Sequence, residues 1–450
     1  MLKIVLVLIA SLPLQSLRAA EIPAALPAEL PAAQPGLPPS DHVMAALQAQ
    51  PQVVEAKALL KAAQARARGL KAGPYETSVR LGLQNRSVSS GSNERFTEWE
   101  GILERPLRLP GKAKLDGRLG DAQVEKTSLA IGDALHEAGR EFLKDWLEWS
   151  RQQESARIWQ AQSALLRQQA EIVEKRIKAG DAPRLEREAA RAALAQSESQ
   201  QKRVELARDT VQAMLHARYP NLPTPEGASL ATPAPTKGTL ESWQTAVLRH
   251  NHELAWAQAG TRVSRLNASR LEANLRPDPA VGIRYSSERG GDEKVIGAFV
   301  SLPLSGAMRR SERDAARVEA EVAALKEATV ARRLALEAES QYLAARLLYQ
   351  SWQQASEAAV AATRQADGMT RAYQLGEASL SDTLMARKLA LEAQLAESMA
   401  RADSIEARYR LMLDAHQLWS LDGDEERGNV PPQQGKFGAL DSDCPCAGLN

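Results

Sequence analysis

The sequence carries one set of motifs twice, and this duplication restricts the fold more than any other feature. Gly180 and Gly376 are 196 residues apart, and an acidic residue follows each glycine by one position and again by six. Upstream, Arg105–Leu107 matches Leu302–Leu304 at an offset of 197 residues. Several motifs in one order at nearly one offset indicate a tandem duplication.

Pro-rich segments separate the two copies from each other and from both ends of the chain. The first residues have the features of a secretory signal, with Lys3, a short apolar run and a small-residue exit at Ala19 and Ala20. The alternative, a buried N-terminal helix, fits so short a run less well. The predicted order is a signal peptide at 1–20, a Pro-rich extended segment at 21–39, a first repeat at 40–218, a linker at 219–238, a second repeat at 239–420 and a disordered tail at 421–450.

Each repeat is predicted to run helix, strand, strand, helix, helix. Strands are indicated by alternation of apolar and polar residues, clearest in the second copy. The strands are expected at about 77–88, 96–107, 280–286 and 294–304.

The helical patterns differ in length in a regular way. Two of them, 112–178 and 305–375, are long enough for helices of roughly 100 Å. The other helices are about half as long, so that two of them would stack end to end beside each long one. These shorter helices are expected at 41–72, with Ser40 or Asp41 as N-cap, and at 183–218, 239–274 and 380–419. The result would be an elongated tube wall.

Composition excludes several other classes of protein. The formal net charge is +1, which argues against a nucleic-acid-binding protein. Aromatic residues make up only 4%, fewer than a compact globule of this length normally uses. No stretch after the signal reaches about 18 apolar residues, which excludes a polytopic helical membrane protein.

The strands favour a different relation to the membrane. About ten residues are enough to cross an outer membrane when the strand is tilted. Four strands cannot close a barrel, so several copies of the chain would have to share one. The alternative is a small soluble sheet that caps a helical bundle, but the hydrophobic partners that such a sheet needs are not apparent.

No catalytic or cofactor motif is present, and we predict neither an enzyme nor a cofactor. His250 and His252 are two residues apart, which is the wrong spacing for two ligands on one helix face, and the other histidines are isolated in sequence. Cys444 and Cys446 in the tail are a weak candidate for a soft metal ion, because no further ligands accompany them.

Taken together, the duplicated block, the Pro-Leu exit from each strand pair and the turn at Tyr373–Asp382 resemble the TolC family of outer-membrane efflux ducts, over residues 40–420. The resemblance implies a homotrimer with a twelve-stranded barrel in outer-membrane lipid and a long helical tunnel across the periplasm. It also implies two partners, a periplasmic adaptor protein and an inner-membrane pump of the resistance-nodulation-division type. The heavy-metal efflux subfamily is the nearest match.

The same resemblance assigns roles to residues at the two turns. Gly180, Leu375 and Gly376 match positions that contact the adaptor. Asp382 matches an acidic ring that narrows the lumen, and Glu186 is its counterpart in the first repeat. Tyr373 matches an aromatic that holds the closed state. One departure is Met385, which stands where the family has a second acidic residue. The alternative is that Asp382 is a solvated or helix-capping carboxylate.

The sequence therefore predicts an outer-membrane exit duct of a tripartite efflux system, which passively conducts substrates, with heavy-metal cations as the favoured class. The alternative function is a periplasmic adaptor or coiled-coil scaffold without a pore. Adaptors also contain long helical hairpins, but one per chain, whereas this sequence has two.

Overall fold

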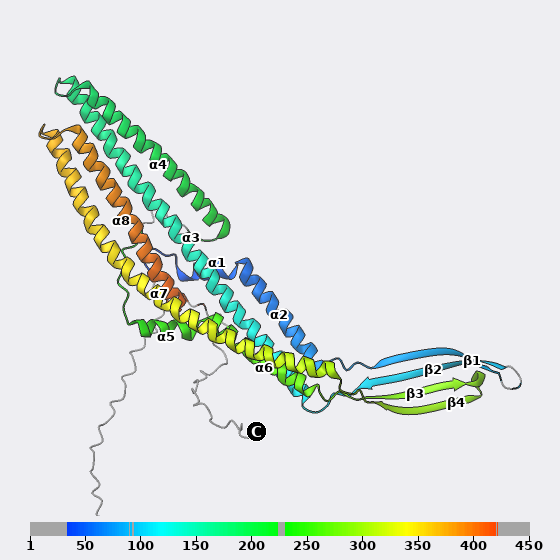
Figure 1. Ribbon diagram of the computed structural model, residues 1–450. Helices are drawn as coiled ribbons and strands as arrows, with labels where there is room; N and C mark the ends of the chain where they lie inside the picture. The colour runs from blue at the N-terminus through cyan, green and yellow to red at the C-terminus, as the bar shows by residue number, and fades with distance from the viewer. Residues whose placement is uncertain (1–33, 90, 92–93, 224–229, 420, 422–450) are drawn as a thin grey trace, which may run out of the picture.

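The computed structural model describes residues 34–89, 91, 94–223, 230–419 and 421 of the chain. The predicted signal peptide, most of the Pro-rich segment at 21–39 and the tail with Cys444 and Cys446 lie outside these residues. The chain forms an elongated helical body with a narrow sheet at one end and two helical turns at the other (Figure 1). This is the predicted mainly α fold with a small β part.

The order of elements repeats once, as the duplication predicts. In the first copy the elements are α1 (Ser40–Gln48), α2 (Pro51–Ala72), β1 (Ser78–Val88), β2 (Glu94–Pro106), α3 (Lys112–Lys178) and α4 (Arg184–Arg218). In the second they are α5 (Leu240–His250), α6 (His252–Ala273), β3 (Ala280–Glu288), the short 3₁₀ turn η1 (Arg289–Gly291), β4 (Glu293–Ser301), α7 (Ala307–Gln374) and α8 (Leu380–Asp414).

The two long helices form the frame of the body. They contain 67 residues in α3 and 68 in α7, while α4 and α8 contain 35 each. α2 and α4 pack along different halves of α3, and α6 and α8 do the same along α7 (Figure 1). The predicted end-to-end arrangement of short helices beside long ones is confirmed.

The opening helix of each repeat is broken in two, which corrects the prediction of single helices. α1 ends at Gln48 and α2 begins at Pro51, because proline has no N–H to continue the helix but fits its first position. The second break is at Asn251, whose extended backbone and side-chain oxygen cap α6 through a hydrogen bond from Leu254 N at 2.8 Å. The predicted Ser40 or Asp41 cap is also wrong, since Pro39 holds that position.

The core is concentrated at mid-length, where α1, α3, α5 and the end of α8 meet. Eight buried aromatic residues gather there, with Phe142 and Trp146 of α3 in ring contact with each other and Phe142 against Tyr219 and Trp419. We call this region the waist core. It holds the main aromatic cluster of a body that is otherwise packed largely through Ala and Leu.

All four strands form one antiparallel sheet in the order β1-β2-β3-β4. Residues that are directly paired across neighbouring strands point to the same face of the sheet. Two rows of four such residues, one residue from each strand, are apolar apart from Gly101 and Tyr285. The rows are Val79, Leu103, Ile283 and Ala298, and then Leu81, Gly101, Tyr285 and Ile296. Leu81 and Ile296 are 78% and 79% exposed, so this apolar face is open to the surroundings.

The opposite face of the sheet is charged. Arg86 pairs with Glu98 at 3.1 Å, and Arg284 of β3 pairs with Glu100 of β2 at 3.1 Å. Gln84 donates a hydrogen bond to Glu98 at 3.0 Å. One sheet thus presents an apolar face and a charged face, and both of its edge strands, β1 and β4, are unpaired on their outer side in this single chain.

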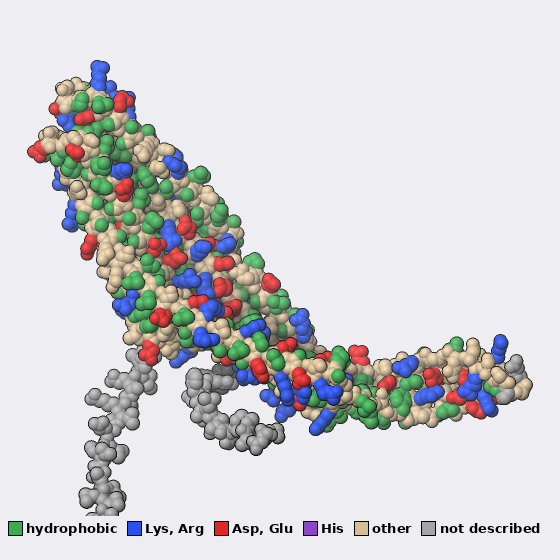
Figure 2. Space-filling model, viewed as in Figure 1, with side chains coloured by type: hydrophobic (Ala, Val, Ile, Leu, Met, Phe, Trp, Pro, Cys, Tyr) green, Lys and Arg blue, Asp and Glu red, His purple; other side chains and the backbone are tan. Residues whose placement is uncertain are grey.

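Among the described residues, no helix combines the length and the apolar character needed to cross a membrane. Charged side chains of both signs are interspersed along the helical body (Figure 2). Several form pairs along one helix, such as Arg333 with Glu337 at 2.7 Å.

Candidate functional site

The end of the molecule opposite the sheet is built from two turns with the same backbone. α3 continues through Ala179 into Gly180 at φ +79°, and α7 continues through Leu375 into Gly376 at φ +81°. In each turn the glycine N–H and the next N–H donate to carbonyls of the last helical turn, which is a Schellman motif. Glycine takes this left-handed conformation without strain, which explains its place in both copies.

A hydrogen-bonded link joins the two hairpins just behind these turns. The Tyr373 hydroxyl of α7 donates to Glu186 Oε2 of α4 at 2.6 Å. Arg176 of α3 donates to the Tyr373 carbonyl oxygen at 3.0 Å, and its guanidinium lies 4.5 Å from the centre of the Tyr373 ring. Asp181 holds Arg176 from the other side, accepting from its Nε at 2.8 Å. We call these four residues the tip link.

Burial keeps the Tyr373 hydroxyl of the tip link protonated. Tyr373 is 1% exposed and packs in a small core with Val173, Ala190 and Leu380. Burial, followed by the hydrogen bond to Glu186, raises the pKa of Tyr373 to about 12. The hydroxyl therefore remains a donor throughout the physiological pH range.

Asp382 lies in the first turn of α8 and is exposed. Its Oδ2 accepts from the Ser379 hydroxyl at 2.8 Å, and its backbone N–H donates to the same hydroxyl oxygen at 3.1 Å. Ser379 is thus the N-cap of α8, and the Asp382 carboxylate accepts the hydroxyl proton of that cap. A supporting part in helix capping, close to the alternative role that the sequence leaves open, is present in the structure.

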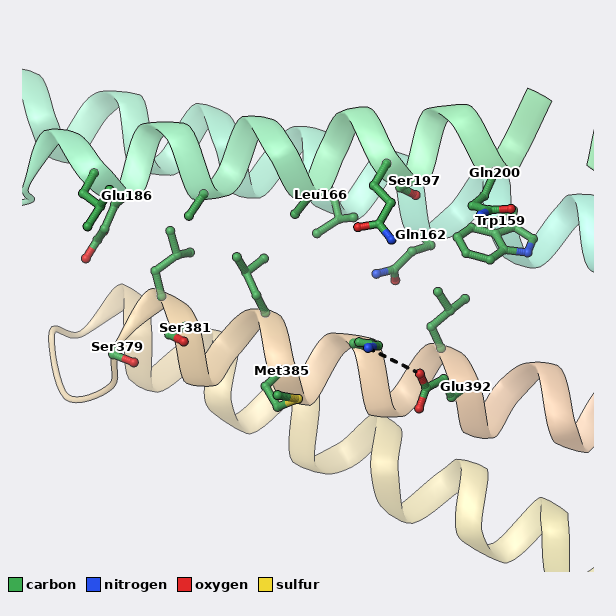
Figure 3. A pocket seen from close by; sticks show the side chains of 18 of the residues that line it. Trp159, Gln162, Leu166, Glu186, Ser197, Gln200, Ser379, Ser381, Met385 and Glu392 are labelled. Atoms are coloured by element: carbon green, nitrogen blue, oxygen red, sulfur yellow. Dashed lines mark ion pairs between the residues drawn. The ribbon is translucent and has the colours of Figure 1, made fainter. Parts of the chain in front are cut away.

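A groove of about 810 Å³ runs from the tip between α4 and α8, with α3 as its floor. Side chains from both helices point into it, including Glu186 and Met385, while Trp159, Gln162 and Leu166 come from α3 (Figure 3). Leu185 and Met385, 78% and 59% exposed, supply much of its apolar surface. The sequence did not predict this groove, because neither helix alone indicates which face the other hairpin leaves open.

Besides Asp382, the structure places the sequence-predicted residues of the tip in two settings. Tyr373 and Glu186 are bonded to each other, which the separate roles assigned to them did not anticipate. Gly180, Gly376 and Leu375 are at the extreme tip, with Leu375 75% exposed. Arg176 and Asp181 were missed, although they flank Gly180 within five residues of each other. No group of three or more metal-ligating side chains is arranged to hold an ion in the part of the chain that the structure describes.

The fold has clear counterparts among solved structures. The outer membrane protein VceC of Vibrio cholerae matches with a TM-score of 0.66 at 16% identity, over 84% of this chain and 99% of that one. The CmeC outer membrane channel of Campylobacter jejuni matches with a TM-score of 0.70 at 13% identity, over 86% and 87%. CusC, whose structures concern transmembrane channel formation, matches with a TM-score of 0.67 at 12% identity, over 88% and 99%.

No protein-family model matches the sequence, and no curated protein is significantly similar to it. At sequence identities of 12–16%, the similarity to these structures is a similarity of fold. The chain therefore has the TolC-like fold of these outer-membrane channels, as its duplicated sequence motifs predict.

Proposed function

We propose that the chain is the outer-membrane exit duct of a tripartite efflux system, with its helical body in the periplasm. The observation that carries this proposal is the sheet with one exposed apolar face and one charged face. An apolar face of this kind is suited to lipid, and a charged face to a water-filled interior. An adaptor or scaffold without a pore, the alternative function, leaves the exposed apolar face unexplained.

The geometry of the sheet supports the proposed trimer, whose copy number comes from the family resemblance. β1 and β4 present free edges, and exposed edges of this length normally need a partner. Three copies joined β4 to β1 would close twelve strands into one barrel, with every edge paired. The long helices would continue that barrel as a tunnel.

Surface labelling tests this topology. Cysteines introduced at Ser89 and Asp292, which follow β1 and η1 at the far end of the sheet, should react with a membrane-impermeant thiol reagent on intact cells. Cysteine at Gly180, at the other end, should react only after the outer membrane is disrupted. Labelling of Gly180→Cys on intact cells would show that the orientation is the reverse of the one proposed. Protection of both sheet positions on intact cells would contradict the proposed duct.

At the opposite end, the two tip turns are the proposed docking points for a periplasmic adaptor, which would connect the duct to an inner-membrane pump of the resistance-nodulation-division type. Gly180, Gly376 and the exposed Leu375 would supply the contact, and the groove beside them offers further apolar surface. The tip link would hold the two hairpins of each chain together in the resting state. The proposal that heavy-metal cations are the exported class rests on the sequence resemblance alone. It can be tested by measuring the sensitivity of a deletion strain to metal salts.

Asp382 is the proposed residue of the lumen constriction. Three exposed carboxylates drawn together at the end of a trimer would attract multivalent cations, and a cation bound there would block the pore. In planar bilayers, Asp382→Ala should bind a blocking cation at least about tenfold more weakly, a change of ~1.4 kcal/mol. Tyr373→Phe, which removes the bond to Glu186, should raise the resting conductance.

Ser379→Ala is the matched control for the Asp382 experiment. It removes the cap on α8 but keeps the carboxylate, so it costs helix stability of about 1 kcal/mol without weakening the cation block. If Ser379→Ala and Asp382→Ala change the block equally, the role of Asp382 is capping and the ring lies elsewhere.

A further inference from the structure

Four of the six histidines of the chain come together beside the waist core. His416, just after α8, is at their centre. Its ring centroid lies 5.7 Å from that of His136, 5.4 Å from that of His250 and 5.0 Å from that of His252. These residues come from α3, from the two sides of the α5–α6 break and from the end of α8. Histidines that are isolated in sequence thus form one cluster in the fold.

The backbone at His416 is unusual for a residue with a side chain. His416 has φ +56° and occupies the left-handed position of a Schellman motif, with Gln417 N donating to Met412 O at 2.7 Å. Gly180 and Gly376 hold the same position in the two tip turns. A side chain is strained in this conformation where glycine is not, and strain of this kind gathers at sites with a function.

A glycine on α3 makes room for a second ring of the cluster. A Cβ atom added at Gly132 would lie 2.4 Å from the His252 ring, so only glycine lets that ring lie against α3. Glycine inside a helix is unfavourable for helix stability. Two locally unfavourable residues, Gly132 and His416, are therefore both explained by the packing of these imidazoles.

The charges around the cluster leave it little capacity for a further proton. His136 is 4% exposed, and its Nε2 lies 3.5 Å from Asp414 Oδ1, but that oxygen also accepts from Arg140 Nε at 3.1 Å. Of the other acids nearby, Glu137 pairs with Arg140 and Glu253 of α6 pairs with Arg333 of α7. Asp133 of α3 lies close enough to Glu137 and Glu253 for their charges to act on it. Burial, followed by the Arg140 charge and the neighbouring His416 and His252, lowers the pKa of His136 to about 3.

We propose that this four-histidine cluster is an acid-sensitive clasp that holds the end of α8 and the α5–α6 junction against α3 while its rings are neutral. The neutral rings pack at interplanar angles of 27–40°. A proton on one ring places a charge within 6 Å of another, so each further proton is opposed. The clasp loosens in acid because, once the pH is below the ordinary histidine pKa of about 6.5, the unfolded chain takes up a proton that buried His136 does not accept in the fold.

The direction of the effect on stability follows from His136. Its pKa is about 3 in the folded protein and 6.5 when unperturbed, so the unfolded chain takes up this proton first. Folding stability is therefore lost as the pH falls from 6.5 toward 3. Asp133 acts in the opposite direction, because burial and the charges of Glu137 and Glu253 raise its pKa. A histidine variant is needed to separate the two effects.

The experiment compares thermal unfolding of the purified full chain in detergent at pH 7.5 and pH 5.5. The wild type should lose at least about 3 °C in Tm between these values. Asparagine tolerates a left-handed backbone but does not titrate. The His416→Asn variant should therefore lose less than half as much in Tm between the two pH values. His42→Asn, at an exposed position of α1, should behave as the wild type.

Hydrogen exchange locates the change within the chain. At pH 5.5 the backbone of α5 and the last turn of α8 should exchange faster in the wild type, after correction for the intrinsic rate, and not in His416→Asn. If His416→Asn does not fold, His250→Gln at an exposed ring replaces it with the same expectation. The proposal of a clasp is overturned if the Tm of the wild type is the same at both pH values, or if both cluster variants lose as much Tm as the wild type.

Discussion

Arginine in place of Leu81 is expected to prevent the protein from accumulating as a trimer in the outer membrane. Leu81 is 78% exposed on the apolar face of the sheet, in a row with Gly101, Tyr285 and Ile296. An arginine on the lipid face of a barrel costs about 2–4 kcal/mol near the bilayer midplane, and a trimer would contain three. The sum for three arginines, about 6–12 kcal/mol, is comparable with the whole free energy of unfolding of a typical protein, about 5–15 kcal/mol.

Gln84→Arg is the matched control, because position 84 lies three residues further on, on the charged face, beside Glu98. This variant should form trimers at the wild-type level. Outer-membrane fractions can be compared on gels with and without heating, since folded trimers migrate differently from denatured chains. Equal amounts of folded trimer for Leu81→Arg and Gln84→Arg would show that the apolar face does not contact lipid.

Proline in place of Gly376 is expected to abolish efflux while leaving the trimer intact. Proline fixes φ near −65°, whereas the turn requires +81°, and proline also lacks the N–H that donates to the Tyr373 carbonyl oxygen at 3.1 Å. The turn must therefore rearrange and move Leu375. The sheet and the waist core are distant from this turn, so assembly should persist (Figure 1).

Two further variants separate docking from turn geometry. Leu375→Asp keeps the glycine and the turn but places a charge on the exposed side chain, and it should also impair efflux strongly. Glu377→Ala, two residues further on, should have little effect. Drug- or metal-resistance assays and crosslinking to the adaptor give the measurements, and full resistance with Gly376→Pro would exclude docking at this turn.

Much of this fold is predictable from the sequence because the duplication supplies an internal comparison. The bounds of α3 were predicted as observed, since its helical pattern is long and no proline interrupts it. The breaks at Pro51 and Asn251 were missed because the apolar pattern continues across them. Pro51 and Asn251 nevertheless carry recognisable local signals, a helix-starting proline and an N-cap.

The contacts between distant segments were not predictable in the same way. Tyr373 and Glu186 are 187 residues apart, and their bond depends on how two hairpins pack. The convergence of His136, His252 and His416 likewise depends on the packing of three helices at the waist core. Sequence spacing describes neighbours along one helix, whereas these groups are neighbours only across helices.

If the chain is the proposed duct, the tip link also has a consequence for the symmetry of its opening. A trimer of duplicated chains has six hairpins and thus approximates a six-fold ring. Ile177 stands three residues before Gly180, where Tyr373 stands three before Gly376, so the first repeat has no hydroxyl to donate to Asp382. In the proposed trimer only three of the six junctions between hairpins would therefore carry this hydrogen bond. The ring would be expected to separate at the other three, so that the hairpins move outward as three coupled pairs.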